Sequence, residues 1–128
     1  MLFIPAEQGL AGLESVIGAL AEAVVVADSD GTIILANPVA ERLFGYPRLA
    51  GKPVEALIPG HLADAHRVYR KLYLNQPERR PMAKHSHLWA RRADGEDFCV
   101  RIGLIPFWTD RGVWTAAVVT ETETPRDS

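Results

Sequence analysis

Cysteine is nearly absent from this sequence of 128 residues, in which Cys99 is the single example. One thiol excludes an intramolecular disulfide and every metal site that needs several cysteine ligands. Long apolar runs are absent too, and the apolar start "MLFI" has no positive charge before it, so neither a signal sequence nor a membrane span is expected. The sequence therefore predicts a protein of the cytoplasm.

A strong net charge is also lacking, because 16 acidic and 14 basic side chains leave a formal charge of −2. Basic residues are dense only between Arg67 and Arg92, and such a run is typical of a solvated face. We therefore expect no nucleic acid and no membrane as a partner. No nucleophile motif and no glycine-rich nucleotide loop occurs, so an enzyme is not expected either.

The length and the 48% of apolar residues suit one globular domain. Its first element is a short amphipathic helix starting at Leu13, because Leu13, Val16, Ile17 and Leu20 recur at the spacing of one helical face. The tail "TETETPRDS" has the composition of a disordered segment. The expected division is an N-terminal extension over 1–12, a domain over 13–119 and a flexible tail over 120–128.

The runs "AVVVAD" and "TIILAN" are rich in β-branched residues and flank an Asp-Gly turn signal, so they predict a hairpin. Asn37 then precedes Pro38, which is the pattern of a capped helix start, over "PVAERLFGY". Asn37→Ala should cost about 1 kcal/mol, as lost caps do. Proline and glycine break residues 47–60 into one-turn pieces, and a longer helix is expected over 61–75.

Three further strands are expected after that helix, separated by turn signals at Asp94-Gly95 and at 109–112. Apolar residues alternate along the middle strand, which indicates one face turned to a core. The predicted fold class is α+β: a five-stranded antiparallel sheet with helices packed on one face, plus the N-terminal amphipathic helix.

Three segments together resemble a PAS sensor domain: "AVVVADSDGTIILANPVAERLFGY", "LAGKPVEALIP" and "RRADGEDFCVRIGLIPF". The resemblance runs from about Leu13 to Val119. It implies a pocket between the sheet and the short helices, a function in sensing, and a sheet surface that often forms a homodimer. It also implies that the domain passes a conformational signal to an output domain or partner, as in histidine kinases or transcriptional regulators of bacterial two-component type.

Alternation and helical spacing predict which side chains converge on this pocket. The expected residues are Ile33, Leu35, Leu43, Leu57, Tyr69, Leu88, Ile102 and Leu104. The residues expected to bind a ligand or cofactor are His66, Tyr69, Ser86, Leu88, Ile102, Leu104 and Asn37.

The cofactor stays open between haem, a non-covalent flavin and none. In "HRVYRKLY", His66 is followed by tyrosines at 69 and 73, which resembles the proximal-histidine helix of haem-binding oxygen-sensor kinases, so His66 is the metal ligand if haem binds. Ser86 stands where those sensors carry an arginine that contacts oxygen, which counts against haem. Flavin-binding light sensors use a cysteine in an "NCRFLQ"-like segment, which this sequence lacks. The preferred interpretation of His66 is a core histidine that is hydrogen-bonded within the domain.

The predicted dimer interface combines the N-terminal helix with the outer face of the sheet. Its residues are Leu13, Val16, Ile17, Leu20, Trp89 and Trp114. The helical stripe is too apolar to leave in water, and the two tryptophans offer large surfaces. The helix can fold back on its own sheet or pair with the sheet of a second copy.

Overall fold

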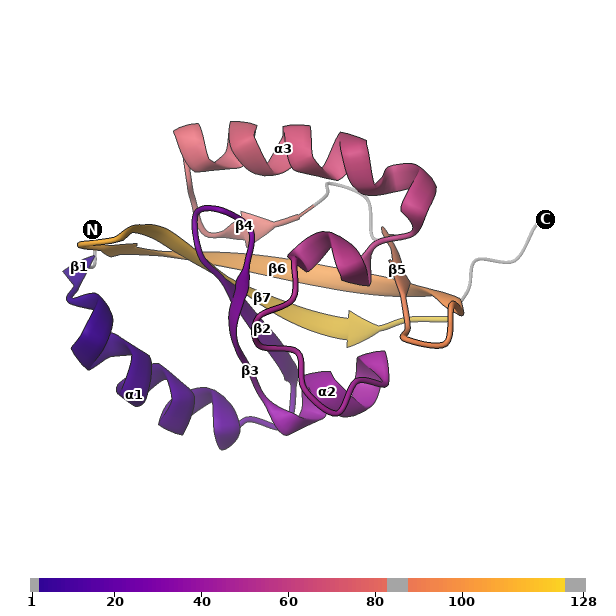
Figure 1. Ribbon diagram of the computed structural model, residues 1–128, viewed down its shortest axis with the longest axis horizontal. Helices are drawn as coiled ribbons and strands as arrows, with labels where there is room; N and C mark the ends of the chain where they lie inside the picture. The colour runs from indigo at the N-terminus through magenta and orange to yellow at the C-terminus, as the bar shows by residue number, and fades with distance from the viewer. Residues whose placement is uncertain (1–2, 83–87, 124–128) are drawn as a thin grey trace.

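A computed structural model describes residues 3–82 and 88–123 of the chain, and its centre is one twisted sheet (Figure 1). The strands follow the order β1-β6-β7-β2-β3, and β4 and β5 also pair with β6. Their bounds are β1 Phe3–Ile4, β2 Ala23–Ala27, β3 Ile33–Ala36, β4 Arg80–Pro81, β5 Leu88–Arg91, β6 Asp97–Thr109 and β7 Gly112–Glu121. The five predicted strands are present as β2, β3, β5, β6 and β7. The sheet gains two two-residue strands, of which β1 is parallel to β6.

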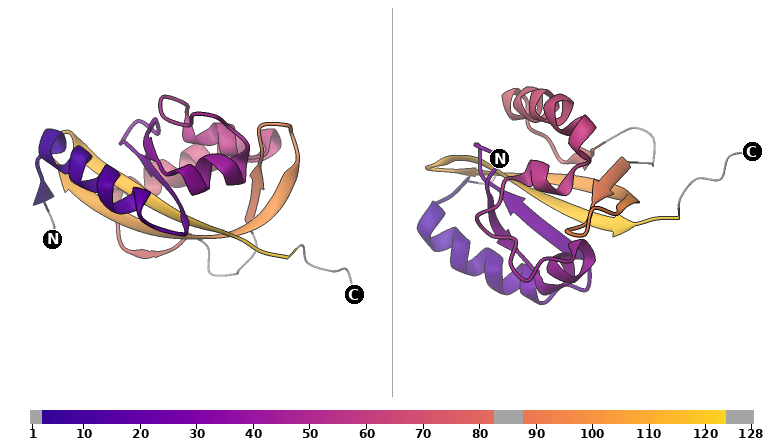
Figure 2. Two further views of the ribbon diagram at one scale, coloured as in Figure 1. Left: turned by 90° about the horizontal axis from the view of Figure 1, so that it is seen from below. Right: turned by 45° about the vertical axis from the view of Figure 1, so that its right-hand side comes forward.

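Helices lie on both sides of this sheet. Their bounds are α1 Ala6–Gly18, α2 Pro38–Phe44, α3 Ala63–Asn75, and the short 3₁₀ helices η1 Val54–Leu57 and η2 Gly60–Leu62. The two views of Figure 2 and the view of Figure 1 place α1 and α3 on opposite sides of the sheet. The predicted α+β class, with helices on one face and an additional N-terminal helix, is confirmed.

The N-terminal helix begins earlier than its apolar stripe predicts. It starts at Ala6, directly after Pro5, so the expected boundary between residues 12 and 13 falls inside α1. Residues 6–12 include alanine, glutamate, glutamine and leucine, which favour helix without adding to the stripe. No helix in the described parts of the chain is both long and apolar enough to cross a membrane.

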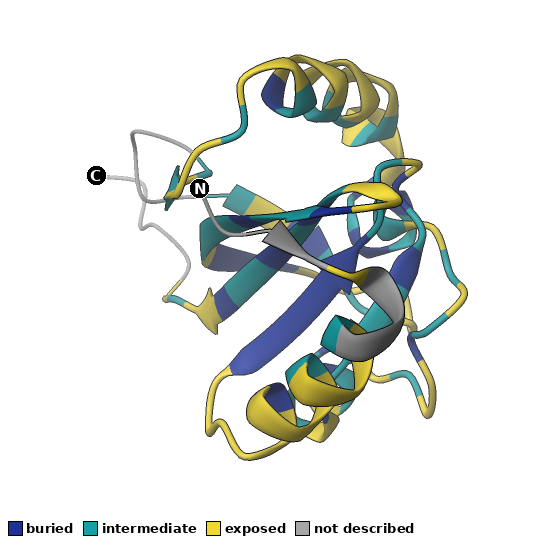
Figure 3. Ribbon diagram, turned by 90° about the vertical axis from the view of Figure 1, so that its left-hand side faces the viewer, coloured by how far each residue is buried: buried dark blue, intermediate teal, exposed yellow. Residues whose placement is uncertain are grey.

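The sheet separates two apolar cores that share its central strands. On one side, Val25 of β2 packs with Phe44 of α2 and Phe98 of β6. On the other side, Val24 and Val26 pack with Ile17, Trp114 and Ala116 beneath α1. Every residue of β2 is buried as a result, as the dark blue central strands of Figure 3 show. Residues that follow one another along β2 therefore belong to different cores.

Candidate functional site

A cavity of about 100 Å³ lies between the sheet and the layer formed by η1 and α3. Its walls are mostly aliphatic and come from seven elements, including Val25 of β2, Leu57 of η1, and Ile102 and Ala117 of β6 and β7. The polar residues that line it are Asp28, His66, Arg70, Tyr73 and Thr115. An apolar enclosure with a few polar groups is the usual form of a small-molecule site.

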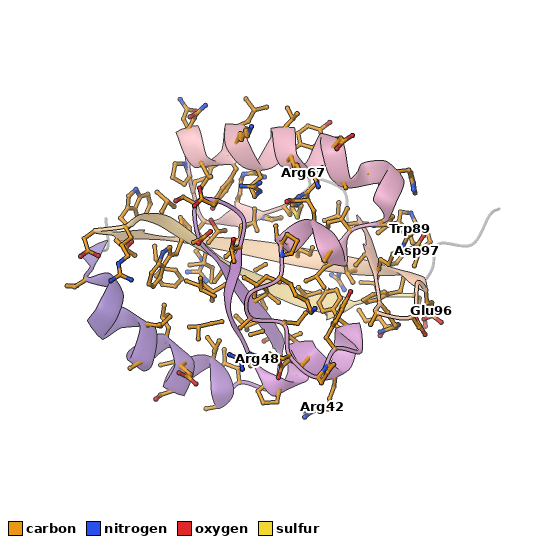
Figure 4. The ribbon with its side chains drawn as sticks, in the orientation of Figure 1. Arg42, Arg48, Arg67, Trp89, Glu96 and Asp97 are labelled. Atoms are coloured by element: carbon orange, nitrogen blue, oxygen red, sulfur yellow. The ribbon has the colours of Figure 1, made fainter. Side chains whose placement is uncertain are left out.

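Glu55 joins η1 to α3 at one wall of the cavity. Its carboxylate is buried, with 5% of the side chain exposed, and Nδ1 of His66 lies 2.6 Å from Oε2. Nε of Arg70 lies 3.4 Å from the same oxygen, whereas Nε of Arg67 lies 3.9 Å from Oε1. Arg67, labelled in Figure 4, comes from α3 above η1 and is half exposed. One buried carboxylate thus holds three residues of α3.

Arg70 lies against the turn that joins β2 to β3. Asp28 closes this turn, because its Oδ1 accepts hydrogen bonds from the backbone N–H groups of Asp30 and Thr32, both at 3.0 Å. Gly31 has a φ of 85°, and a Cβ at this position would lie 2.5 Å from Cζ of Arg70. Glycine therefore serves both the turn and the close approach of the guanidinium.

Tyr73 lies near the C-terminal end of α3 and joins the helix to the segment that follows it. Its phenol donates a hydrogen bond of 2.6 Å to the carbonyl of Glu78, and Arg80 stacks over its ring at 5.2 Å. Burial raises the pKa of the Tyr73 phenol above its ordinary value of 10.0, because the phenolate would lose its hydration. Tyr73 thus anchors α3 only in its neutral form.

The raised pKa of Tyr73 predicts a loss of stability at alkaline pH. A group whose pKa is higher in the folded state contributes its full stabilisation below the unfolded pKa and loses it as pH rises above that value. The free energy of unfolding should therefore fall more steeply above about pH 10 in the wild type than in Tyr73→Phe. Denaturant unfolding measured from neutral to alkaline pH tests this. Tyr69→Phe is the control because Tyr69 is 67% exposed, and identical slopes for wild type and Tyr73→Phe would refute the prediction.

Of the residues expected to bind a ligand, the structure places His66, Ile102 and Leu104 at the cavity. The prediction that Tyr69 lines the cavity is wrong. Its side chain lies on the exposed flank of α3, next to the face that lines the cavity. Leu88 packs against the adjoining core but does not line the cavity. Ser86 lies outside the described residues.

Asn37 does not line the cavity either. Its side-chain amide makes four hydrogen bonds, all to backbone groups. Oδ1 accepts from the N–H groups of Ala40 at 2.9 Å and Val24 at 3.0 Å. Nδ2 donates to the carbonyls of Ile17 at 2.9 Å and Glu22 at 2.7 Å. The predicted cap of α2 is confirmed, whereas an amide with four internal bonds has no free group for a ligand.

The remaining residues expected to converge on the pocket divide between the two cores. Leu57 lines the cavity, and Ile33 and Leu43 belong to the core on the same side of the sheet. Leu35 is a correction, because it packs with Ile17 and Trp114 on the α1 side. Strand β3 is short and lies at the edge of the sheet, so its alternation alone does not tell which face is covered.

The expected dimer residues fall into a covered and an exposed group. Ile17 and Trp114 are 5% and 4% exposed, and Leu13 packs against them, so α1 folds back on its own sheet. Val16 and Leu20 point outward, with exposed fractions of 61% and 44%. Trp89 is 42% exposed and lies at the far end of the sheet beside Glu96 and Asp97 (Figure 4).

The cavity is too small for the two cofactors considered from the sequence. A cavity of about 150 Å³ is known to hold benzene, and a haem macrocycle or a flavin ring system is several times larger. His66 has a nitrogen donor suited to iron, and its Nδ1 is bonded to Glu55, as ligating histidines often are to a carboxylate. With α3 in the described position, the cavity volume suits a molecule much smaller than haem or flavin.

Several cavity residues were not anticipated from the sequence. Arg70 and Tyr73 share the inward face of α3 with His66, at spacings of four and seven residues, and this period was the available signal. Met82 also lines the cavity. Glu55 had no signal, because its partners lie on another element.

Comparison with known proteins agrees with the fold. A family model described as "PAS domain" matches residues 21–123. An uncharacterised protein of Azorhizobium caulinodans is 39% identical over 80 residues, which make up 60% of this chain but 11% of that relative. Among solved structures, the LOV protein of Rhodobacter sphaeroides has a TM-score of 0.74 at 20% identity, over 91% of this chain and 68% of that one. A PAS domain from a two-component sensor histidine kinase has a TM-score of 0.67 at 16% identity, over 91% and 99%.

Proposed function

The chain belongs to the PAS domain family, and from this premise we propose that it is a sensor whose cavity binds a small molecule and thereby alters a homodimer contact. The proposed role is regulatory and not catalytic. The domain acts in the cytoplasm on an attached output domain or a separate partner of the histidine-kinase or transcriptional-regulator type. The long relative from Azorhizobium supports an attached output, because the matched segment is a small part of it.

The observation that carries this proposal is the sharing of β2 and β7 between the cavity and the core beneath α1. Val25 and Ala117 line the cavity. Their neighbours Val24 and Ala116 belong to the other core, together with Ile17 of α1. Interiors are close-packed, so a ligand that displaces β7 changes the packing of α1 as well. A signal from the cavity thus has a short route to the opposite face.

Binding of a small molecule is tested by a fragment screen with a variant that fills the cavity. Chemical shifts of methyl groups in Leu57 and Ile102 should respond to small apolar fragments in the wild type. Ala117→Leu adds methyl groups to a cavity wall and should weaken this binding at least about tenfold. Ala65→Leu is the control, because Ala65 is exposed on α3. No response to any fragment would remove the proposed function.

Dimerisation is tested at the outward side of α1. Val16→Glu with Leu20→Glu should convert the dimer to a monomer in sedimentation, because two charges replace exposed apolar side chains. Folding should survive, since Ile17 remains beneath the helix. The control is Val68→Glu with Leu72→Glu on the exposed flank of α3, which should leave the dimer intact. A wild-type monomer at high micromolar concentration would contradict the interface.

A visible absorption spectrum of protein purified from cells supplied with haem and flavin completes these tests. We expect no band from either cofactor, because neither fits the cavity. A stoichiometric Soret band that Glu55→Gln weakens would instead establish His66 as an iron ligand.

A further inference from the structure

The Arg70 guanidinium has few acceptors for a group that is largely removed from water. Its side chain is 17% exposed. Nε donates to Glu55 at 3.4 Å and Nη1 to the Ser29 carbonyl at 3.5 Å, both close to the outer limit of hydrogen bonding. A guanidinium carries five N–H donors, so most of them meet no acceptor among the described residues.

The two acids near Arg70 already have other donors. Glu55 accepts the short contact from His66 at 2.6 Å and also faces Arg67. Asp28 uses Oδ1 for two backbone N–H groups of its turn. Arg70 thus shares Glu55 with His66 and Arg67 through one long contact of 3.4 Å, and the close approach of Gly31 keeps the guanidinium beside the cavity. Arg70 therefore has Glu55 as its acid, but both of its protein contacts are long, and its remaining N–H donors face solvent or the cavity, where a ligand can receive them.

The rest of the cavity sets the size and polarity of a partner. Aliphatic side chains of β6, β7 and η1 form most of the wall, and Arg70 is the cavity-lining residue that is cationic at every pH, among those the structure describes. A volume of about 100 Å³ admits an apolar body somewhat smaller than benzene. Such a body, with one acceptor-rich end, matches both parts of the site.

We propose that the cavity binds a small apolar monocarboxylate and that Arg70 receives its carboxylate. This inference rests on the proposed function, because it names the class of molecule that the sensor detects. A carboxylate supplies two acceptor oxygens in the geometry of the guanidinium fork, whereas an alcohol supplies one and an amine none. The apolar end of the ligand lies against Ile102, Leu57 and Ala117.

The test compares three probes with the same branched five-carbon skeleton: isovalerate, isoamyl alcohol and isoamylamine. Affinity is measured by titration of the methyl signals of Leu57 and Ile102. Isovalerate should bind at least about tenfold more tightly than the alcohol, the gain expected from a charge-assisted hydrogen bond. The amine should bind more weakly than either. This comparison needs only the wild-type protein.

Variants then assign the preference to Arg70. Arg70→Met keeps the length of the side chain and should bring isovalerate and the alcohol to equal affinity, while Arg70→Lys should retain part of the difference. Arg67→Met removes the same charge from the same helix but not from the cavity wall, so the preference should persist. Equal affinities in the wild type, or a preference that survives Arg70→Met, would overturn the inference.

The possible failures are distinguishable. If the alcohol binds as well as isovalerate and Ala117→Leu weakens both, the cavity is a ligand site without carboxylate recognition, and only this inference fails. The same holds if none of the three probes binds but other fragments do. If neither the probes nor any fragment binds, the proposed function fails with it.

Discussion

Replacing Asn37 with alanine will lower the free energy of unfolding by about 3 kcal/mol, which exceeds the loss of about 1 kcal/mol that its helix cap alone predicts and is the largest we expect from removing one polar side chain of this domain. The substitution leaves two buried backbone N–H groups without their acceptor and removes a donor from the carbonyls of Ile17 and Glu22, of which the first keeps a bond from the N–H of Leu20 at 3.2 Å and the second is part-buried. These groups belong to α1, β2, α2 and the loop that precedes β2, so the loss weakens the junction of three elements. Denaturant unfolding of both proteins measures it.

Asn75→Ala is the matched control for this substitution, because Asn75 is exposed at the end of α3. It should change the free energy of unfolding by less than about 0.5 kcal/mol. Asn37→Asp separates the two halves of the amide: it keeps an acceptor for Val24 and Ala40 but turns an oxygen toward the carbonyls of Ile17 and Glu22. A loss for Asn37→Ala no larger than that of a simple helix cap would show that the long-range bonds contribute nothing.

Glu55→Ala will have the second largest effect, a loss of about 2 kcal/mol. It leaves His66 and Arg70 without their shared acid, although these side chains are 14% and 17% exposed and retain some access to water. Breaking a fully buried ion pair costs more, so the partial exposure reduces our figure. Glu55→Gln should lie between alanine and wild type, because the amide keeps an acceptor. Denaturant unfolding at neutral pH is the measurement.

Arg67→Ala is the comparison for the Glu55 cluster, which consists of Glu55, His66, Arg67 and Arg70. Arg67 faces the same carboxylate at 3.9 Å but is 48% exposed, so its loss should cost less than about 0.5 kcal/mol. Glu55→Ala and Arg67→Ala of equal cost would mean that the buried carboxylate does not hold α3. Comparable ligand affinity in Glu55→Ala and wild type would add that the position of α3 is set elsewhere.

The fold could be predicted from the sequence because its signals are local. Asp30-Gly31 and Asp94-Gly95 mark turns at which both glycines have positive φ, and the strands on either side carry their own alternation. The residues of the candidate site could be predicted less completely from the sequence. Helix α3 has one apolar stripe toward the cavity, through Tyr73 and Leu74, and a second exposed one, through Tyr69 and Leu72. Periodicity detects both stripes but does not say which one is covered.

Long-range polar contacts were the other part that the sequence did not reveal. The cap that Asn37 makes with Ala40 spans three residues and has a known local pattern, but its bonds to Ile17 and Glu22 cross 20 and 15 residues. The pairing of Glu55 with His66 depends on how η1 docks beside α3. Such contacts follow from tertiary packing, and no spacing of residues along the sequence predicts them.

Few residues of α3 are buried, and this low burial has a consequence for the rate at which a ligand could exchange. Tyr73 is buried in this helix, while its other residues are half-buried or exposed, and Figure 3 shows it mostly in yellow and teal. A segment with little buried area opens at a fraction of the global unfolding free energy and can do so while the sheet stays folded. Because this helix is also a wall of the cavity, we expect that a ligand of the proposed sensor enters and leaves more easily when α3 opens locally. Under the proposed function, the residence time of the ligand then depends on how often α3 separates from the sheet, and the contacts of Glu55 with His66 and Arg70 slow this step.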